Sequence, residues 1–224
     1  MVKNSTNGPV IMRSIESYCT ELLSSPTPTT AFDTLAHAQS LLLYQIIRLF
    51  DGDIFARASA ERSITALETA AIALLPHVPF DEPLLPAPTL PLTPLGPTKR
   101  FWKQWLFQES ARRTMLFIFF FLQTYRIVSG GKILPCDGKL WLVHSWTLSA
   151  YLWQADTPVG FAKVWKDRNH FVVTNACFNA VLAEAKADDV DQFGRMLICA
   201  MMGQDEADAW LTERGGSLRE GVCA

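Results

Sequence analysis

The side chains of this sequence that could take part in chemistry lie in one aromatic stretch and shortly before it. His144 is followed closely by Trp146, Tyr151 and Trp153, and Tyr125 precedes it at the end of a Phe-rich segment. Aromatic side chains around one titratable imidazole can hold and polarise a small apolar ligand. Tyr125, His144, Trp146, Tyr151 and Trp153 are therefore the candidate ligand-binding residues. Core packing of the Trp and Tyr side chains is the alternative.

Motifs of enzymes and of metal sites are missing from the sequence. There is no nucleophile elbow, no zinc-protease motif, no phosphate-binding loop and no dinucleotide glycine fingerprint. The five cysteines are scattered and include no CxxC pair, and the four histidines lie far apart. We expect no metal and no cofactor, and the sequence identifies no catalytic residue.

Charge and hydropathy restrict the partners and the location. The formal net charge is −2, so no basic surface indicates direct nucleic-acid binding. Residues 184–213 carry eight acidic and two basic side chains, which favours a solvated face or a surface for a protein partner. The longest apolar run, 115–122, is much shorter than the roughly 20 residues of a membrane span. With no signal peptide evident, we expect an intracellular protein, cytoplasmic or nuclear, without membrane contact.

Apolar spacing predicts an all-α fold of about 6–8 helices in a single helical domain. Asp33 and Asp53 are expected to cap two helices, over 33–50 and 54–75, that form an antiparallel hairpin. A long helix is predicted from Thr98 to residue 128, and an irregular segment leads into a helix near 143–154. Further helices are predicted over 158–165, 170–186, 189–203 and 205–213.

Proline marks the main interruption of this helical pattern. Eight of the thirteen prolines lie between residues 76 and 97. Because proline cannot donate to a helix or a sheet ladder, we expect a long loop over 76–98 inside one domain. The expected organisation is a polar N-terminal extension (1–30), the helical domain (31–218) and a short tail (219–224).

Several blocks of the sequence resemble the C-terminal regulatory region of fungal zinc-cluster transcription factors. They are LAHAQSLLLYQIIRLFDGDIFARASAE, WKQWLFQESARRTMLF, WTLSAYLWQA with the following FAKVW, and DVDQFGRMLICAMMG through ADAWLTERGG. They occur in this order from about residue 31 to 218. Family members normally begin with a six-cysteine, two-zinc cluster that binds DNA, and this sequence contains no such cluster. The resemblance therefore implies a region of this kind that does not bind DNA in the family's way.

The sequence is consistent with two functions. The first is a stand-alone regulatory or small-molecule-binding domain tied to fungal secondary metabolism, acting through a protein partner or as a homodimer. The second is a repurposed cofactor-free enzyme, a cyclase or Diels-Alderase-type pericyclase, that folds a hydrophobic metabolite in an aromatic pocket. Holding the reacting atoms together can remove roughly 7–11 kcal/mol of a barrier without a metal or cofactor. Both hypotheses predict a hydrophobic small molecule as the ligand.

Overall fold

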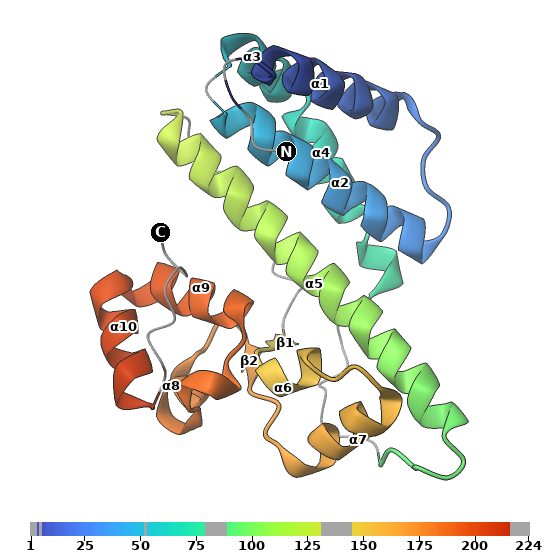
Figure 1. Cartoon of the computed structure of the whole chain (residues 1–224), viewed down its shortest axis with the longest axis vertical. Coiled ribbons are helices and arrows are strands. Elements are labelled where there is room, and N and C mark those ends of the chain that lie inside the picture. The colour runs from blue at the N-terminus through green and yellow to red at the C-terminus, as the bar shows by residue number, and fades with distance from the viewer. Residues whose placement is uncertain (1–3, 5, 52, 79–88, 131–144, 216–224) are drawn as a thin grey trace. The chain divides into compact units, whose positions relative to one another are not determined.

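The computed structural model describes residue 4 and residues 6–51, 53–78, 89–130 and 145–215 (Figure 1). The described residues form ten α-helices, two short 3₁₀ helices and one two-stranded sheet, which confirms the all-α class. The helices outnumber the expected 6–8 because several are short. Even the Phe-rich helix is not apolar enough over its length to cross a membrane, and neither is any other described helix.

Contacts between residues divide the chain into two compact units. Unit 1 comprises Met1–Pro79 and Ser110–Leu140, and unit 2 comprises Phe80–Glu109 and Trp141–Ala224. Helix α5 (Gly96–Val128) contributes its N-terminal part to unit 2 and its C-terminal part to unit 1. This helix was predicted from residue 98 to 128, and the prediction is confirmed to within two residues. The middle of the Pro-rich stretch, residues 79–88, lies outside the described residues.

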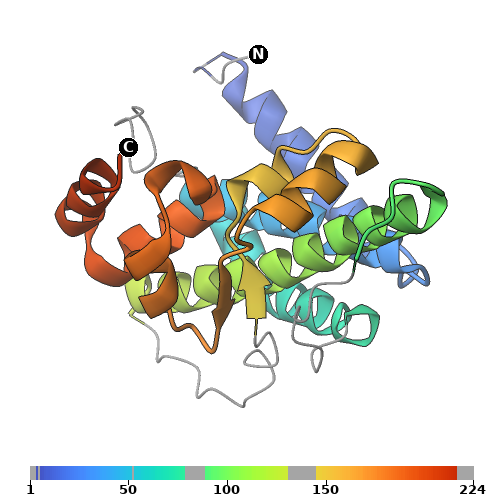
Figure 2. The same ribbon diagram turned by 90° about the horizontal axis from the view of Figure 1, so that it is seen from below.

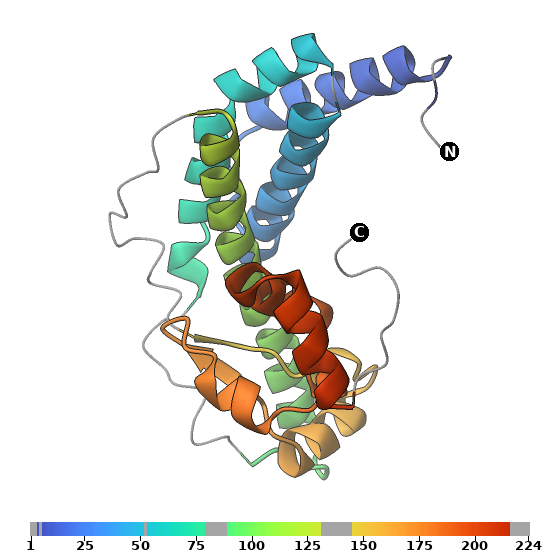
Figure 3. The same cartoon turned by 90° about the vertical axis from the view of Figure 1, so that its left-hand side faces the viewer.

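Unit 1 is built from α1 (Gly8–Ser24), α2 (Ala31–Phe50), α3 (Ile54–Arg62), α4 (Ile64–Ile72) and the 3₁₀ helix η1 (Leu75–His77). Figure 3 shows α2, α4 and the C-terminal half of α5 running alongside one another. Thr30, rather than the expected Asp33, caps α2, since its hydroxyl accepts a hydrogen bond from the backbone N–H of Asp33 at 3.1 Å. Asp53 caps α3 as predicted. The single helix expected over 54–75 is divided at Ser63.

Residues 1–30 are more than a polar extension, because α1 forms there and packs on α2. Met12 and Cys19 are buried on the inner face of α1. Between them, Glu16 forms an ion pair with the buried Arg48 of α2, at 2.9 Å between Oε2 and Nε. Met12, Glu16 and Cys19 follow one another at spacings of four and three residues, so all three lie on one face of α1.

Unit 2 continues with β1 (Ser145–Thr147), α6 (Ala150–Trp153), α7 (Pro158–Asp167) and β2 (Val172–Thr174). It ends with α8 (Asn179–Glu184), the 3₁₀ helix η3 (Ala187–Asp189), α9 (Gln192–Met202) and α10 (Gln204–Glu213). Strands β1 and β2 pair antiparallel, with Trp146 opposite Val173 (Figure 2). The predictions for α7, α9 and α10 are confirmed within a few residues.

Two sequence predictions in unit 2 are corrected by this sheet. Residues 170–186 were expected to form one helix, but β2 occupies 172–174 and the helix starts at Asn179. The helix expected near 143–154 is the four-residue α6, preceded by β1. The buried Glu109 of α5 fixes β1, because its carboxylate accepts from the backbone N–H and the hydroxyl of Thr147, at 3.1 and 3.2 Å.

Candidate functional site

Unit 2 holds a group of packed aromatic side chains that we call the aromatic cluster. Its buried centre is formed by Trp105 of α5, Leu152 of α6, and Phe161 and Trp165 of α7. Phe161 and Trp165 are four residues apart in α7, so both face the same side of that helix. Seven partly buried residues pack around the centre: Leu90, Phe101, Trp102, Leu106, Trp153, Ala155 and Val164.

The rings of the aromatic cluster contact one another in a continuous series. Trp105 lies 5.1 Å from both Trp153 and Phe161, measured between ring centroids. Phe161 stacks on Trp165 at 5.5 Å and 27°, and Phe101 meets Trp165 edge-on at 5.0 Å. Such pairs each contribute about 0.5–1.5 kcal/mol beyond the apolar area that they bury. Trp165 is therefore contacted by two other rings of the cluster, Phe101 and Phe161.

Several indole N–H groups of the cluster lack an acceptor. The Nε1 atoms of Trp102, Trp105 and Trp165 are buried and have no hydrogen-bond partner among the described residues. A buried donor without a partner costs roughly 1–3 kcal/mol, so native proteins leave few of them.

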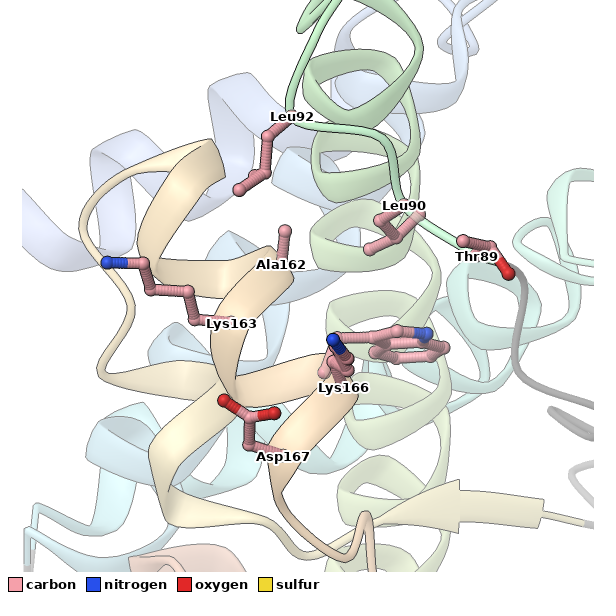
Figure 4. A pocket seen from close by; sticks show the side chains of 8 residues that line it. Thr89, Leu90, Leu92, Ala162, Lys163, Lys166 and Asp167 are labelled. Carbon is pink, nitrogen blue, oxygen red and sulfur yellow. The ribbon is translucent and has the colours of Figure 1, made fainter.

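A pocket of about 530 Å³ lies beside the aromatic cluster, and we call it the α7 pocket. Figure 4 shows Leu90 and Leu92, from the segment before α5, opposite Ala162 of α7. Trp165 also lines this pocket, as do Thr89, Lys163, Lys166 and Asp167. An apolar wall with a few charged groups, at this volume, is typical of sites for small molecules.

Trp165 also lines a second pocket, of about 400 Å³, which we call the His170 pocket. The imidazole of His170 lies 4.0 Å from the Trp165 ring, and His170 is only 7% exposed. Its Nε2 lies 2.8 Å from the backbone carbonyl oxygen of Trp165. The other lining residues are Arg168, Asn169, Phe171, Val172, Ala180, Val181 and Glu184.

The protonation state of His170 follows from these contacts. A carbonyl oxygen can only accept, so Nε2 carries the proton and Nδ1 has the free lone pair. Burial lowers the pKa of His170 below its usual value, and the hydrogen bond to Trp165 opposes this more weakly. His170 is therefore neutral near pH 7, and its Nδ1 has no hydrogen-bond partner among the described residues.

Three of the five ligand-binding candidates predicted from the sequence lie at different places in unit 2. Trp153 belongs to the aromatic cluster, where it contacts Trp105. Trp146 is buried in β1, and its ring meets Phe178 at 6.4 Å between centroids. Tyr151 of α6 is half-buried, with the guanidinium of Arg168 4.6 Å from the centre of its ring.

The other two candidates are Tyr125 and His144. Tyr125 belongs to unit 1, where it is buried in α5 and donates a hydrogen bond from its hydroxyl to Glu61. Burial, aided by Glu61, raises the pKa of Tyr125. His144 lies outside the described residues. None of the four described candidates lines the α7 pocket or the His170 pocket.

Sequence reasoning missed Trp165 and His170, although a signal existed. His144 was chosen for its aromatic neighbours, and His170 follows Trp165 by five residues and directly precedes Phe171. The pairing of His170 with a carbonyl oxygen depends on the end of α7, which spacing alone does not locate. In the part of the chain that the structure describes, no group of three or more His, Cys, Asp or Glu side chains could hold a metal ion.

Comparison with known proteins gives one informative relative. Transcription factor gsfR2 from Penicillium aethiopicum is 30% identical to this chain over 212 residues. The chain is similar to part of a fungal transcription factor. The matched region covers 94% of this chain and 50% of gsfR2, so the chain spans about half the length of that relative. No family model matches the chain. No solved structure matches it either.

Proposed function

We propose that this chain is a regulatory domain of the fungal transcription-factor kind that binds a hydrophobic small molecule in the α7 pocket. The single observation that carries the regulatory role is the 30% identity to gsfR2 over 94% of the chain. It favours a regulator because the similarity extends through both compact units rather than over one segment. In this proposal the domain acts in the nucleus and controls genes of fungal secondary metabolism.

The ligand in this proposal is an apolar molecule with oxygen acceptors. Leu90, Leu92 and Ala162 offer an aliphatic wall, and the buried face of Trp165 offers an aromatic one. Lys163 and Lys166 at the rim can donate hydrogen bonds to carbonyl or carboxylate oxygens. Apolar contact then supplies affinity while the polar rim orients the molecule.

The proposed output is contact with another protein rather than direct contact with DNA. The net charge of −2 gives no support to phosphate binding. Helix α10 starts with the exposed acids Asp205 and Glu206, and Asp188 and Glu213 are exposed nearby in the sequence. An acidic surface of this kind favours a basic protein partner, since complementary charge accelerates association.

A repurposed cofactor-free cyclase or Diels-Alderase-type pericyclase is the second candidate. It is favoured by the aromatic cluster, because Trp165 offers an aromatic surface in the α7 pocket against which a polyene could fold. Such an enzyme would use the same hydrophobic class of molecule but would convert it.

Deletion of the gene in its native host separates the two candidates, with transcripts and metabolites measured from the same cultures. For a regulator, we expect neighbouring transcripts to fall and the wild-type gene to restore them. The variant Leu92→Trp fills the α7 pocket from an exposed position and should not restore them. The same change at Leu23, an exposed position of α1, is the control. Steady transcripts with an accumulating uncyclised precursor would refute the regulator and support the enzyme.

A further inference from the structure

The His170 pocket has a hydrogen-bond acceptor that is fixed in place. The ring of His170 packs against Trp165, and its Nε2–H is engaged by the carbonyl oxygen of Trp165 at 2.8 Å. The imidazole therefore cannot rotate to present a donor without losing that hydrogen bond. Nδ1, which has no partner among the described residues, is left as an acceptor.

The backbone next to His170 is held in a costly conformation. Phe171 has a φ of +47°, in the left-handed region that bulky side chains rarely adopt. Two hydrogen bonds hold it there: its N–H donates to Oδ1 of Asn169 at 3.0 Å, and its carbonyl accepts from the N–H of Leu148 at 3.1 Å. Strained residues of this kind concentrate at ligand sites, because the surrounding contacts keep a side chain in one position.

The other residues that line the His170 pocket determine which kind of molecule it can bind. Phe171, Val172 and Val181 are apolar, while Arg168 and Glu184 supply one charge of each sign. Arg168 lies over the ring of Tyr151, and Glu184 accepts from the side-chain amide of Asn169 at 3.5 Å. With these charges balanced and engaged, the pocket favours an uncharged molecule over an ion.

We propose that the His170 pocket binds a small uncharged aromatic molecule with a hydroxyl group, of the phenol type, whose O–H donates to Nδ1 of His170. The ring of the molecule packs against Phe171, Val172 and Val181. A molecule of the same shape without a donor buries Nδ1 unpaired, and that penalty makes the pocket selective for the hydroxyl. This site is separate from the α7 pocket, and its occupancy does not depend on the regulatory function.

The first test compares naphthol with its methyl ether, methoxynaphthalene, by calorimetric titration of the full chain. The two probes share the ring system, but only naphthol can donate a hydrogen bond. We expect naphthol to bind about five- to tenfold more tightly, as one hydrogen bond of ordinary strength implies. Equal affinity for the two probes, or no binding of either, would overturn the proposal.

The second test removes the acceptor. In His170→Phe a ring can still pack against Trp165, but no nitrogen and therefore no lone pair remains at the position of Nδ1. We expect this variant to bind naphthol no better than methoxynaphthalene. The variant Leu92→Trp, which fills the α7 pocket, is the control and should keep the wild-type preference. A preference that persists in His170→Phe would contradict the assigned role of Nδ1.

Nitrogen NMR of the wild-type protein tests the same contact without a variant. The imidazole of His170 should show a protonated Nε2 and an unprotonated Nδ1 in the free protein. Addition of naphthol should shift the Nδ1 resonance strongly and the Nε2 resonance weakly. A proton on Nδ1 in the free protein, or a shift confined to other histidines, would refute the proposal even if the Phe variant failed to fold.

Discussion

The buried ion pair of unit 1 leads to a quantitative prediction about its stability. Arg48 is 2% exposed, and its guanidinium contacts Glu16, the hydroxyl of Ser59 at 2.8 Å and the sulfur of Cys19 at 2.8 Å. Glu16 is the only acidic group that these contacts include, and its side chain is 39% exposed. The perturbation is Glu16→Gln, which keeps the size of the side chain and removes its charge.

The magnitude follows from the burial of the two partners. Removing one partner of a fully buried ion pair costs about 3–5 kcal/mol, because the other charge is left uncompensated. Water can reach the exposed part of Glu16, so we expect a smaller loss of about 2 kcal/mol in the free energy of unfolding for Glu16→Gln. Arg48→Met should cost a similar amount, and the double variant only slightly more than either, since no unpaired charge remains.

The assay is urea unfolding of the two single variants and the double variant, followed by far-UV circular dichroism. Hydrogen exchange of α2 amides should accompany it, because the two compact units need not unfold together. A coupling energy of about 2 kcal/mol between the two positions is expected. If the two losses simply add, Glu16 does not compensate the charge of Arg48 and the reasoning is wrong.

Three further predictions concern unit 2. An alanine Cβ at Gly194 of α9 would lie 2.6 Å from Val190 Cγ1 and 3.0 Å from Leu148 Cδ2. Gly194→Ala should therefore lower the midpoint of urea unfolding, since overpacking costs about 1–3 kcal/mol against a helix-propensity gain of about 1 kcal/mol. Trp105→Ala should cost about 3–5 kcal/mol in the same assay, and a loss below 1 kcal/mol would contradict its central place in the aromatic cluster. Because the folded state lowers the pKa of His170, the unfolded chain binds the proton more readily. The stabilisation from neutral His170 should thus be present above about pH 6.5 and be lost as the pH falls through the lowered pKa. His170→Gln should show a smaller loss of stability on acidification, measured by urea unfolding at several pH values.

Helices with dense apolar spacing could be predicted from the sequence. For α5, α7, α9 and α10 the predicted and observed bounds agree closely, because each has a clear start or stop residue. Helix α1 was missed because the face that packs on α2 includes a charged residue: Glu16 lies between the buried Met12 and Cys19 and pairs with Arg48. A charged residue facing inward has no signature in hydropathy.

The sheet shows a second limit. Val172 and Val173 were assigned to a helix that continues through residue 186, although β-branched residues favour strands. What makes them a strand is the pairing of Val173 with Trp146, more than 20 residues earlier in the chain. Local propensity does not decide between helix and strand over so short a segment, whereas a partner strand does.

By itself, the sequence determined the helical class and the interruption by prolines, since these depend on composition and on short-range periodicity. Only the tertiary structure decided which aromatic residues surround a pocket and which histidine has a free acceptor. Trp153, which the sequence analysis had proposed, belongs to the aromatic cluster. Trp165 and His170, which line the His170 pocket, were not among the proposed residues. The physical reason is that the lone pair on Nδ1 of His170 depends on one carbonyl oxygen at the end of α7 and on burial against Trp165, and both arise only from the folded packing of the chain.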